Sequence, residues 1–543
     1  MRAWKTRLPD CAPARQCSTR FGRGRREARP DATPAGRSRV GAEEDLRRGV
    51  PVSRLFAGFG AVLRARADTL TATEQANVFR MSHKVDGFDF FISHVSSTPG
   101  FKKYITLVVD RLGFLGFAIA AMVSFGIFLF QVYVDELPRS RAFTVHDSFF
   151  GHEWTPSVWE LLGGVSAAWL VYAFGHSLWR RTCCFLDCAS ICQSDAELKA
   201  AGISNIPAFL RASRELVVLW DEWYFTRLWC IYEIAVVQSV GSIPIRILPM
   251  DVYAFLALGQ VYWYAAGLGW FLFLPWLPGL LGTHVATVLA GVPVFALQAH
   301  TGRTFARLFA QLQEQFERFD VRSAAISFDS DRAFICDSIE DMFDGDLDKF
   351  NTAVRTTIKS AAMHSLMGQR SIISYWGMMW QLLPAVPFFC SKFSSTMHLP
   401  LYYQMPHYIF GVTFVFCVLP VYCAAAMELG KRCTRGTRPG GARAALAFLG
   451  VGVFVAALLT AWTELVFIAP HVDGHMWWTH PFGAMGSLLL AVSVSGVTWV
   501  VTVWVYRPRI RVEADRQGST LEASEAPRPG RVELEFNAGQ NDA

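Results

Sequence analysis

The sequence is short of charge. Asp, Glu, Lys and Arg together make up only 18% of its 543 residues, whereas soluble globular domains carry about 25%. Hydrophobic residues account for 52% of the chain, and the mean hydropathy is positive, at +0.27. This balance argues against an ordinary soluble domain. It predicts an integral membrane protein with the lipid bilayer as its first partner.

Several common signatures of chemistry are also missing. The chain has no glycine-rich phosphate loop, no HExxH motif and no GxSxG motif. Its twelve cysteines do not form a disulfide framework, because several fall in or beside apolar stretches and the rest lack paired spacing. Cys183, Cys184, Cys188 and Cys192 do gather, but the first two lie in a predicted buried strand, where neighbours face opposite sides. We therefore expect no metal site and no bound cofactor.

The first part of the chain is basic and poor in residues that could pack. Residues 1–50 contain twelve arginines against six acidic residues, with Ala, Pro, Gly and Ser between them. This composition predicts a disordered basic arm over 1–85, and residues 507–543 are predicted to be a disordered cytosolic tail. The acidic residues argue against a transit peptide. Aromatic residues are scarce in the arm, so no nucleic-acid partner is expected.

Apolar stretches long enough to cross a membrane recur along the chain. Eight are predicted, which gives a polytopic α-helical membrane protein with transmembrane hairpins at 112–179 and 253–298 and four further spans within 375–506. The fifth stretch is short and broken by proline. The eight stretches are 112–134, 157–179, 254–276, 278–298, 375–391, 408–427, 444–463 and 482–506.

The basic residues between these stretches predict the orientation. The segments between spans 2 and 3, 4 and 5, and 6 and 7 carry seven, nine and five Lys and Arg, whereas the alternate segments carry only Arg139, Arg141 and Lys392. Loops rich in Lys and Arg stay in the cytosol. Both termini and the segments 180–252 and 299–374 are therefore expected on the cytosolic side.

Two of the cytosolic pieces alternate between strand and helix patterns. An apolar run ending at Ser93 and His94 precedes a helix in 86–111, and the return from span 2 offers further elements within 180–252. Such alternation predicts a parallel, doubly wound, flavodoxin-like α/β lobe that is interrupted by a transmembrane hairpin. The later elements are strands at 183–187, 215–220 and 243–250 and helices at 203–213 and 225–239. Segment 299–374 either completes the lobe, with a strand from 323–343, or stands as a separate helical element.

The order of residues in this lobe resembles the TIR (Toll/interleukin-receptor) domain, from its second strand to its third helix. Phe90 to Ser93 is similar to the first TIR strand, and the likeness covers about a sixth of the chain. Two features depart from the family: a membrane hairpin replaces a short connection, and a fifth strand is missing before span 3. The resemblance is carried by Phe185-Leu186-Asp187, Leu198, Gly202, Ile203, Ile206, Leu210, Ser213, Val217-Val218, Tyr224, Trp229-Cys230 and Glu233-Ile234.

The resemblance implies a function for Glu233. TIR domains that cleave NAD⁺ hold their essential glutamate in this helix, in a W-x-x-x-E context that is kept here as Trp229 and Glu233. A carboxylate suits this chemistry, because breaking the nicotinamide–ribose bond builds positive charge on the ribose. NAD⁺ would then be a substrate rather than a cofactor, contacted by Ser93, His94 and Asp187 near strand ends and by Trp229.

Simpler interpretations of the same residues remain open. Glu233 suits a half-exposed carboxylate at the rim of a helix, and the residues at the strand ends suit turns or caps. Many TIR domains only bind one another. We therefore expect a membrane-tethered, TIR-like signalling protein that self-associates, with NAD⁺ hydrolysis by Glu233 as a further step. The alternative is a transporter or channel with a regulatory lobe, for which a continuous polar lining through spans 5–8 would be evidence.

Overall fold

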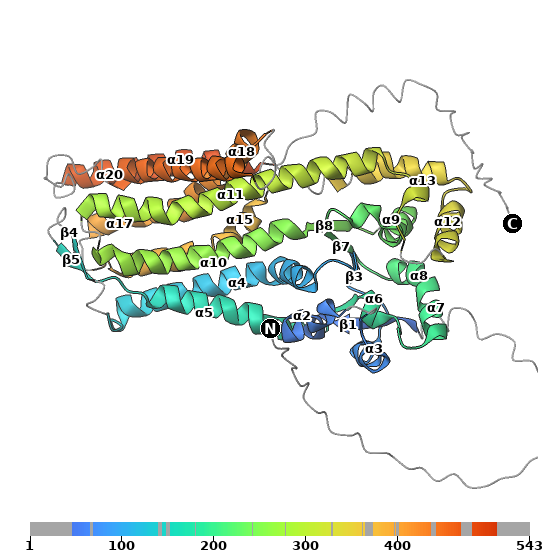
Figure 1. Ribbon diagram of the computed structural model, residues 1–543. Helices are drawn as coiled ribbons and strands as arrows, with labels where there is room; N and C mark the ends of the chain where they lie inside the picture. Colours follow the sequence, from blue (N-terminus) through green and yellow to red (C-terminus); the bar gives the residue numbers. More distant parts are fainter. Residues whose placement is uncertain are drawn as a thin grey trace, which may run out of the picture.

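The structure is a computed structural model. It describes residues 46–507 except 66–68, 140–143, 148–151, 180, 242, 277–278, 327–329, 361, 364–372, 396, 398–400, 436–440 and 468–480. Long helices run side by side at one end of the molecule, and a mixed α/β lobe forms the other end (Figure 1).

The lobe is built on a six-stranded sheet with the strand order β2-β1-β6-β3-β7-β8. β3, β6, β7 and β8 run parallel, and β1 pairs antiparallel with β6 and β2. Phe90 of β3 pairs with Cys184 of β6, so two pieces of chain on either side of a long helical hairpin meet in one sheet, as predicted. The strands are β1 (Arg48–Pro51), β2 (His83–Lys84), β3 (Phe90–His94), β6 (Cys183–Phe185), β7 (Leu216–Trp220) and β8 (Ile245–Pro249).

Helices cover both faces of this sheet. Phe91 faces the side covered by α8 (Ile206–Arg211) and α9 (Leu228–Val240), where it belongs to one buried cluster with residues of both helices. Phe90 and Ile92 point the other way, into a cluster with α2 (Val52–Arg64) and α4 (Gly100–Tyr133). A strand buried on both faces is apolar at every position rather than at alternate ones. This explains why short unbroken apolar runs marked the strands in the sequence.

The expected disordered arm is wrong for the described residues between 46 and 84, which are 46–65 and 69–84. This stretch forms β1, α2, α3 (Ala72–Phe79) and β2, with α6 (Asp187–Ser190) and α7 (Ala196–Ser204) elsewhere in the lobe. The physical reason is that α2 buries Leu55 and Phe56 fully against the lobe. α2 also contains a left-handed turn at Gly58, Phe59 and Gly60, where a Cβ on Gly60 would lie 2.6 Å from the Tyr104 ring. Residues 1–45 and the predicted tail beyond 507 lie outside the described residues.

Segment 299–374 completes the lobe with helices rather than with a strand. α11 (Gly279–Glu317) runs unbroken from the bundle into the lobe, and α12 (Ser330–Met342) and α13 (Leu347–Ala353) follow it. Leu312, Phe316 and Ile335 share the buried cluster of α9. The strand expected from 323–343 is wrong: within the described part of that segment, Ala325 makes a single bridge with Arg227 and the rest of the regular structure is helical.

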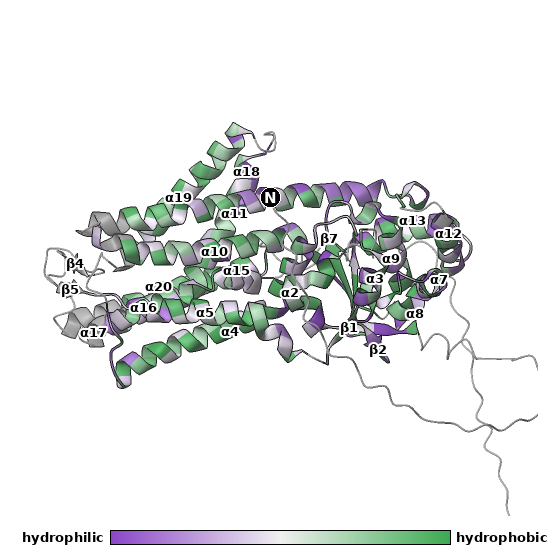
Figure 2. Ribbon diagram, turned by 60° about the horizontal axis from the view of Figure 1, so that its bottom comes forward, coloured by the Kyte–Doolittle hydropathy of each residue, from purple (hydrophilic) through white to green (hydrophobic). Residues whose placement is uncertain are grey.

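Six helices in the described residues are long and apolar enough to cross a membrane, which fits a polytopic helical membrane protein. Figure 2 shows these hydrophobic helices set against a more hydrophilic lobe. The expected number was eight. The third expected span forms α10 (Met250–Phe273), and the fifth is split into α15 (Tyr375–Gln381) and α16 (Ala385–Ser395). The six are Gly100–Tyr133, Trp159–Leu178, Val285–Glu317, Tyr408–Cys433, Ala442–Trp462 and Leu488–Tyr506.

The difference between the eight expected spans and the six candidate spans of the described residues has a physical origin. α10 is rich in Trp, Tyr and Gly and also contains Gln260, and these residues lower its hydropathy. Pro384 and Pro387 interrupt the fifth stretch. The remaining bundle helices are α5 (Trp159–Phe174), α17 (Leu401–Thr413), α18 (Leu419–Cys433), α19 (Ala442–Phe467) and α20 (Pro481–Tyr506), and a short hairpin of β4 (Val145–Asp147) and β5 (His152–Trp154) lies at the bundle end farthest from the lobe (Figure 1).

Candidate functional site

The candidate site lies where β3 and β7 end. These two strands are neighbours in the sheet and run parallel, so their carboxyl ends meet at one edge. Ser93 and His94 are the last residues of β3, and Asp221 follows β7 directly. The chain then makes a short turn through Tyr224 and enters α9, whose second turn carries Glu233.

Three side chains form a line of hydrogen bonds at this edge. The Tyr224 hydroxyl lies 2.5 Å from Ser93 Oγ, and the Ser93 hydroxyl donates to Glu233 Oε2. With Glu233 ionised, Ser93 must donate to the carboxylate, and Tyr224 in turn donates to Ser93. Ser93 and Tyr224 are fully buried. The order Tyr224–Ser93–Glu233 therefore links the strand before the membrane hairpin to the helix after it.

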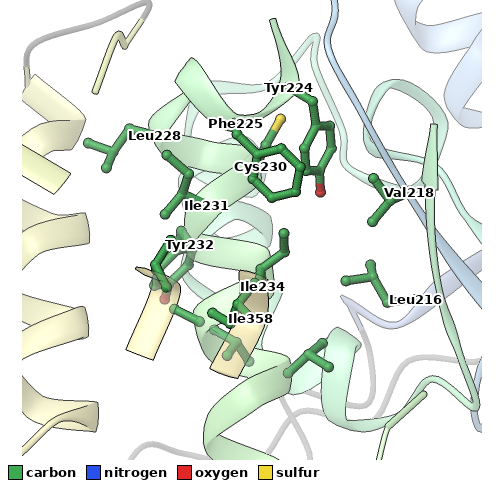
Figure 3. Close-up of a cluster of buried hydrophobic side chains, with 14 of the residues drawn as sticks. Leu216, Val218, Tyr224, Phe225, Leu228, Cys230, Ile231, Tyr232, Ile234 and Ile358 are labelled. Carbon is green, nitrogen blue, oxygen red and sulfur yellow. The ribbon is translucent and has the colours of Figure 1, made fainter. Parts of the chain in front are cut away.

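Local sequence patterns place each of these groups. Side chains alternate along a strand, so Ser93 faces the same side as Phe91, which is the side covered by α9. α9 is apolar on more than one side: Cys230 and Ile234 point toward β7, whereas Leu228 and Ile231 point away from it (Figure 3). The helix ends at Val240, and Gly241 forms a left-handed C-cap. Figure 3 shows Tyr224 and Phe225 in this core, with Tyr224 beside Cys230 of α9.

Burial changes the acid–base properties of Glu233. Burial raises the pKa of the Glu233 carboxyl to about 8, and the nearby Asp187 carboxylate adds to this shift, whereas the hydrogen bond from Ser93 opposes it. The free protein therefore holds Glu233 mostly protonated at pH 7. Burial also raises the pKa of Tyr224 well above its ordinary value, with the Cys230 thiol and Glu233 adding to the effect.

His94 and Asp187 extend the site along the sheet edge. His94 Nε2 lies 3.9 Å from Asp187 Oδ1, and the His94 side chain is only 10% exposed. Burial lowers the pKa of His94 to about 4, and the positive charge of Lys103 contributes, although Asp187 acts in the opposite direction. The imidazole is therefore neutral at physiological pH. The site thus combines an uncharged base with a carboxyl group that can ionise.

Four of the five predicted site residues come together, and Trp229 stands apart. Trp229 lies one turn before Glu233 on α9, but its ring packs edge-on to Tyr232, with 5.7 Å between ring centroids. It borders the core cluster of the lobe. Among the described contacts, none joins Trp229 to Ser93 or Glu233, so its expected contact with a nucleotide stays a prediction.

Tyr224, Thr98 and Asp221 also belong to the site, although no role was expected for them from the sequence. Thr98 Oγ1 donates to Asp221 Oδ2, and the other oxygen of Asp221 accepts from the backbone N–H of Trp223 at 3.0 Å. These bonds hold the turn that carries Tyr224. The sequence did contain a signal for Asp221. It is a polar residue directly after the buried strand β7, and the carboxyl end of β7 meets that of β3.

A cavity of about 490 Å³ lies on the other side of this turn. The cavity lies beside residues 222–226 and the end of α11, and its walls include Trp223, Gln311 and Arg318. Ser93 and Glu233 do not line it. Ser93 and Tyr224 are buried, whereas Glu233 is partly exposed. Within the described ranges, no three His, Cys, Asp or Glu side chains gather as metal ligands.

Comparison with known proteins gives no relative: no family model, no curated protein and no solved structure matches this chain.

Proposed function

We propose that the lobe is a TIR-like module and that Glu233 is the carboxylate of an NAD⁺-cleaving site. The hydrogen bond between Ser93 and Glu233, at the meeting point of β3 and β7, is the observation that carries the proposal. If the parallel strands are numbered in chain order, the sheet order β6-β3-β7-β8 becomes 2-1-3-4, as in flavodoxin-like folds. In such sheets, ligands bind where the order reverses, between strands 1 and 3. That is the edge on which Ser93 lies.

The proposed reaction suits a buried carboxyl group. The bond between the ribose C1′ and the nicotinamide nitrogen breaks, and its electron pair leaves with the nicotinamide, which becomes neutral. Water then adds to C1′ and releases one proton. The positive charge that develops on the ribose is stabilised by an adjacent anion. The bound substrate already carries a positive pyridinium ring, which lowers the pKa of Glu233 and favours its ionised form.

The other chain groups at the site have supporting roles. Ser93 donates to the ionised Glu233 and fixes its orientation, and Tyr224 holds Ser93 in turn. His94 and Asp187 stand at the same edge, within reach of the polar groups of a nucleotide. Ser93 and Tyr224 are buried, so Glu233, which is partly exposed, is the member of this group that a substrate can reach directly.

We further propose that the module works by self-association at the membrane. The helices that continue from the lobe, α4 and α11, are also candidate spans, so the lobe is tied closely to the bilayer. Confinement to a surface raises the effective concentration of the lobes for one another. The distribution of Lys and Arg supports a cytosolic position for the lobe and both termini.

The test is NAD⁺ turnover by the full chain in liposomes. Wild type, Glu233→Ala and Glu222→Gln are compared, because Glu222 is an exposed carboxylate in the neighbouring turn and serves as a matched control. We expect Glu222→Gln to retain turnover and Glu233→Ala to lose it. Equal turnover in wild type and Glu233→Ala contradicts a role for Glu233. If none of the three proteins turns over NAD⁺ but chemical cross-linking still joins the lobes, the lobe is an interaction module without enzymatic activity.

The packing of the later helices supports this proposal over the transporter alternative. Buried residues of α15, α16, α18 and α19, such as Met378, Cys423 and Val455, belong to one apolar cluster in the described part of these helices. A continuous polar lining is the feature that the alternative predicts. The alternative stays a prediction, which ion or solute flux into the same liposomes would test.

A further inference from the structure

One carboxylate is fully buried in the helical bundle. Glu160 lies in the first turn of α5, and none of its surface is exposed. An isolated ionised carboxylate in an apolar medium is strongly unfavourable unless it is paired or well hydrogen-bonded. In membrane helices such residues mark functional sites more often than not. The groups around Glu160 must therefore stabilise its buried carboxylate.

Three side chains from separate elements converge on this carboxylate. Gln131 Nε2, from the last turn of α4, donates to Glu160 Oε1 at 2.6 Å. Ser157 Oγ donates to Oε2 at 2.6 Å, and Ser391 Oγ, from α16, donates to the same oxygen at 3.3 Å. The helices approach closely because Gly164 has no side chain, and the Ser124 hydroxyl fits there and donates to the Glu160 carbonyl.

All of these ligand-type groups are buried. Ser157 is 1% exposed and Ser391 is fully buried, and the backbone N–H of Leu161 donates to Ser391 Oγ at 3.1 Å. Ser157 is fixed in the same way, since its backbone N–H donates to Ser395 Oγ at 3.0 Å. The oxygens are therefore held in place by the backbone of two helices. A preorganised set of oxygens is what a hard cation requires of a protein.

The negative charge of Glu160 has no cationic side chain beside it. Among the described residues, no Lys or Arg forms an ion pair with Glu160; the nearby Arg139 pairs with Glu136 instead, at 3.7 Å, and donates to the carbonyls of Thr155 and Ser394. The cluster therefore combines one formal negative charge with several neutral oxygens. One monovalent cation would balance it, whereas a divalent ion would leave a positive charge in the bundle.

A second observation also indicates a ligand. The side-chain oxygen of Gln131 is buried and has no hydrogen-bond partner within the described part of the chain, although Gln131 is only 6% exposed. Buried acceptors without partners are rare and often mark an absent water or ion. Its amide is aimed at Glu160 and Ser157, which lie 2.6 Å and 3.0 Å from Nε2. Turning the amide by half a rotation brings Oε1 to the position where Nε2 now stands.

We propose that Glu160, Gln131, Ser157 and Ser391 form a binding site for a Na⁺ ion that joins α4, α5 and α16. With the Gln131 amide turned, the ion would meet the two carboxylate oxygens, one amide oxygen and two hydroxyl oxygens, all of the hard oxygen type that alkali and alkaline-earth ions prefer. The carboxylate and its three donors are already in contact at hydrogen-bond distances of 2.6 to 3.3 Å. An ion must replace these bonds, and the smaller Na⁺ requires less expansion of the cluster than K⁺.

The experiment measures thermal unfolding of the purified full chain in detergent by its tryptophan fluorescence. NaCl, KCl and choline chloride are titrated at constant total salt and pH. A ligand that binds only the folded state raises Tm in a saturable manner. We expect Na⁺ to raise the Tm of wild type, with choline giving no effect and K⁺ a weaker one. Binding of radioactive Na⁺ to the same samples gives a second readout.

Matched variants assign the effect to this cluster. Glu160→Gln keeps the size of the side chain but removes the charge and replaces one acceptor oxygen with a donor nitrogen, so we expect its Tm to be independent of Na⁺. Ser391→Ala removes one weaker ligand and should raise the half-saturating Na⁺ concentration severalfold. Glu136→Gln, whose side chain is 71% exposed in the wild type, should respond to Na⁺ as wild type does.

Three results would overturn the proposal. The first is a wild-type Tm that is the same in NaCl and choline chloride. The second is a Na⁺ effect that persists unchanged in both Glu160→Gln and Ser391→Ala. The third is stabilisation of wild type by lower pH without any Na⁺ dependence, which would mean that a proton occupies the carboxyl group.

Discussion

At the scale of single residues, Glu233 differs from an ordinary surface glutamate because it is held between a serine and an apolar core. Its pKa is raised to about 8 by burial, and the hydrogen bond from Ser93 moderates this shift. A carboxyl group that titrates near neutrality is typical of a functional site rather than of a simple rim position. Both the chemistry and the stability of the lobe should therefore depend on pH below about 8.

The pH profile of NAD⁺ turnover tests this directly. Values of kcat/KM report the ionisation of groups in the free enzyme. We expect kcat/KM to rise with pH and to level off above a pH of about 8, where Glu233 is ionised. Ser93→Ala removes the bond that lowers the pKa of Glu233, so its profile should be displaced to higher pH. A flat wild-type profile, or a displacement of the variant to lower pH, contradicts this assignment.

Stability should show the same ionisation with a defined sign. Between the ordinary pKa of 4.5 and the folded value of about 8, the folded protein binds more protons at Glu233 than the unfolded chain does, so wild-type stability falls as pH rises. Glu233→Gln lacks this loss. Its Tm relative to wild type should therefore increase from pH 5 to pH 8 and then stay constant.

The loss of wild-type stability caused by the raised pKa of Glu233 has an upper bound of roughly 5 kcal/mol, since each unit of pKa shift corresponds to about 1.4 kcal/mol. The partial exposure of Glu233 makes the loss smaller than this bound. The measurement is Tm from tryptophan fluorescence in detergent at several pH values. Glu222→Gln is the control, because it removes an exposed carboxylate from the neighbouring turn. A Tm difference for Glu233→Gln that shrinks as pH rises would show that the pKa of Glu233 is lowered instead.

At the scale of elements, the sequence predicted the parallel strands β3, β6, β7 and β8 and the helix α9 to within a few residues. Strands buried on both faces are continuous apolar runs, and these remain visible without any tertiary information. β1 and β2 were missed because they contain only four and two residues and exist through pairing with each other and with β6. Elements so short carry no periodic signal of their own.

The site was predictable to a similar degree. Ser93, His94 and Asp187 follow from the rule that polar residues at parallel strand ends share one edge, and Glu233 followed from the resemblance in α9. Tyr224 was missed because it lies in a three-residue turn, where no hydrophobic period applies. The orientation of Trp229 was also outside the reach of sequence patterns, since it depends on the ring of Tyr232.

The helix α11 connects the membrane bundle to the site at this scale. Phe316 packs on Phe225 with 4.5 Å between ring centroids, and Gln315 Nε2 donates to the Glu222 carbonyl at 2.6 Å. The segment after α11 holds the same turn, because the Leu228 N–H donates to the Ala325 carbonyl at 2.9 Å. The turn that carries Tyr224 is therefore fixed from outside by a candidate membrane span and the chain that follows it.

Hydrogen exchange of residues 222–226 tests this connection. Gln315→Ala removes one hydrogen bond, which contributes about 1 kcal/mol, so exchange in the turn should become roughly five times faster. Gln313→Ala, an exposed position on the same helix, should leave exchange unchanged. Equal exchange in both variants would mean that α11 does not restrain the turn.

At the scale of the whole molecule, charged side chains join the lobe to the bundle. Arg246 of β8 pairs with Asp110 of α4 at 2.6 Å and with Glu215 at 3.1 Å, and Arg111 pairs with Glu215 at 2.5 Å. The Asp110 side chain is only 6% exposed. Because α4 continues from this network into a candidate membrane span, the network sets how the lobe is held against the bundle.

Removing the central arginine should destabilise the whole chain. Arg246→Met removes the closest partner of the buried Asp110 and leaves Arg111 Nε at 3.6 Å, which we expect to lower stability by about 1–3 kcal/mol after allowance for the partial exposure of Arg246. Arg214→Met is the control, because the Arg214 side chain is 83% exposed and its pair with Asp89 is of the weak surface type. Thermal unfolding of both variants gives the comparison. If the two variants have the same Tm, the network does not contribute to the stability of the chain.

The central claim is that Ser93, before the membrane hairpin, and Glu233, after it, act as one unit in a single site. The most direct test is a double-mutant cycle of NAD⁺ turnover in liposomes with Ser93→Ala, Glu233→Gln and the double variant. We predict that the double variant loses no more turnover than Glu233→Gln alone, because Ser93 acts through Glu233. The account is contradicted if the fold-losses of the two single variants multiply in the double variant, or if neither substitution changes turnover.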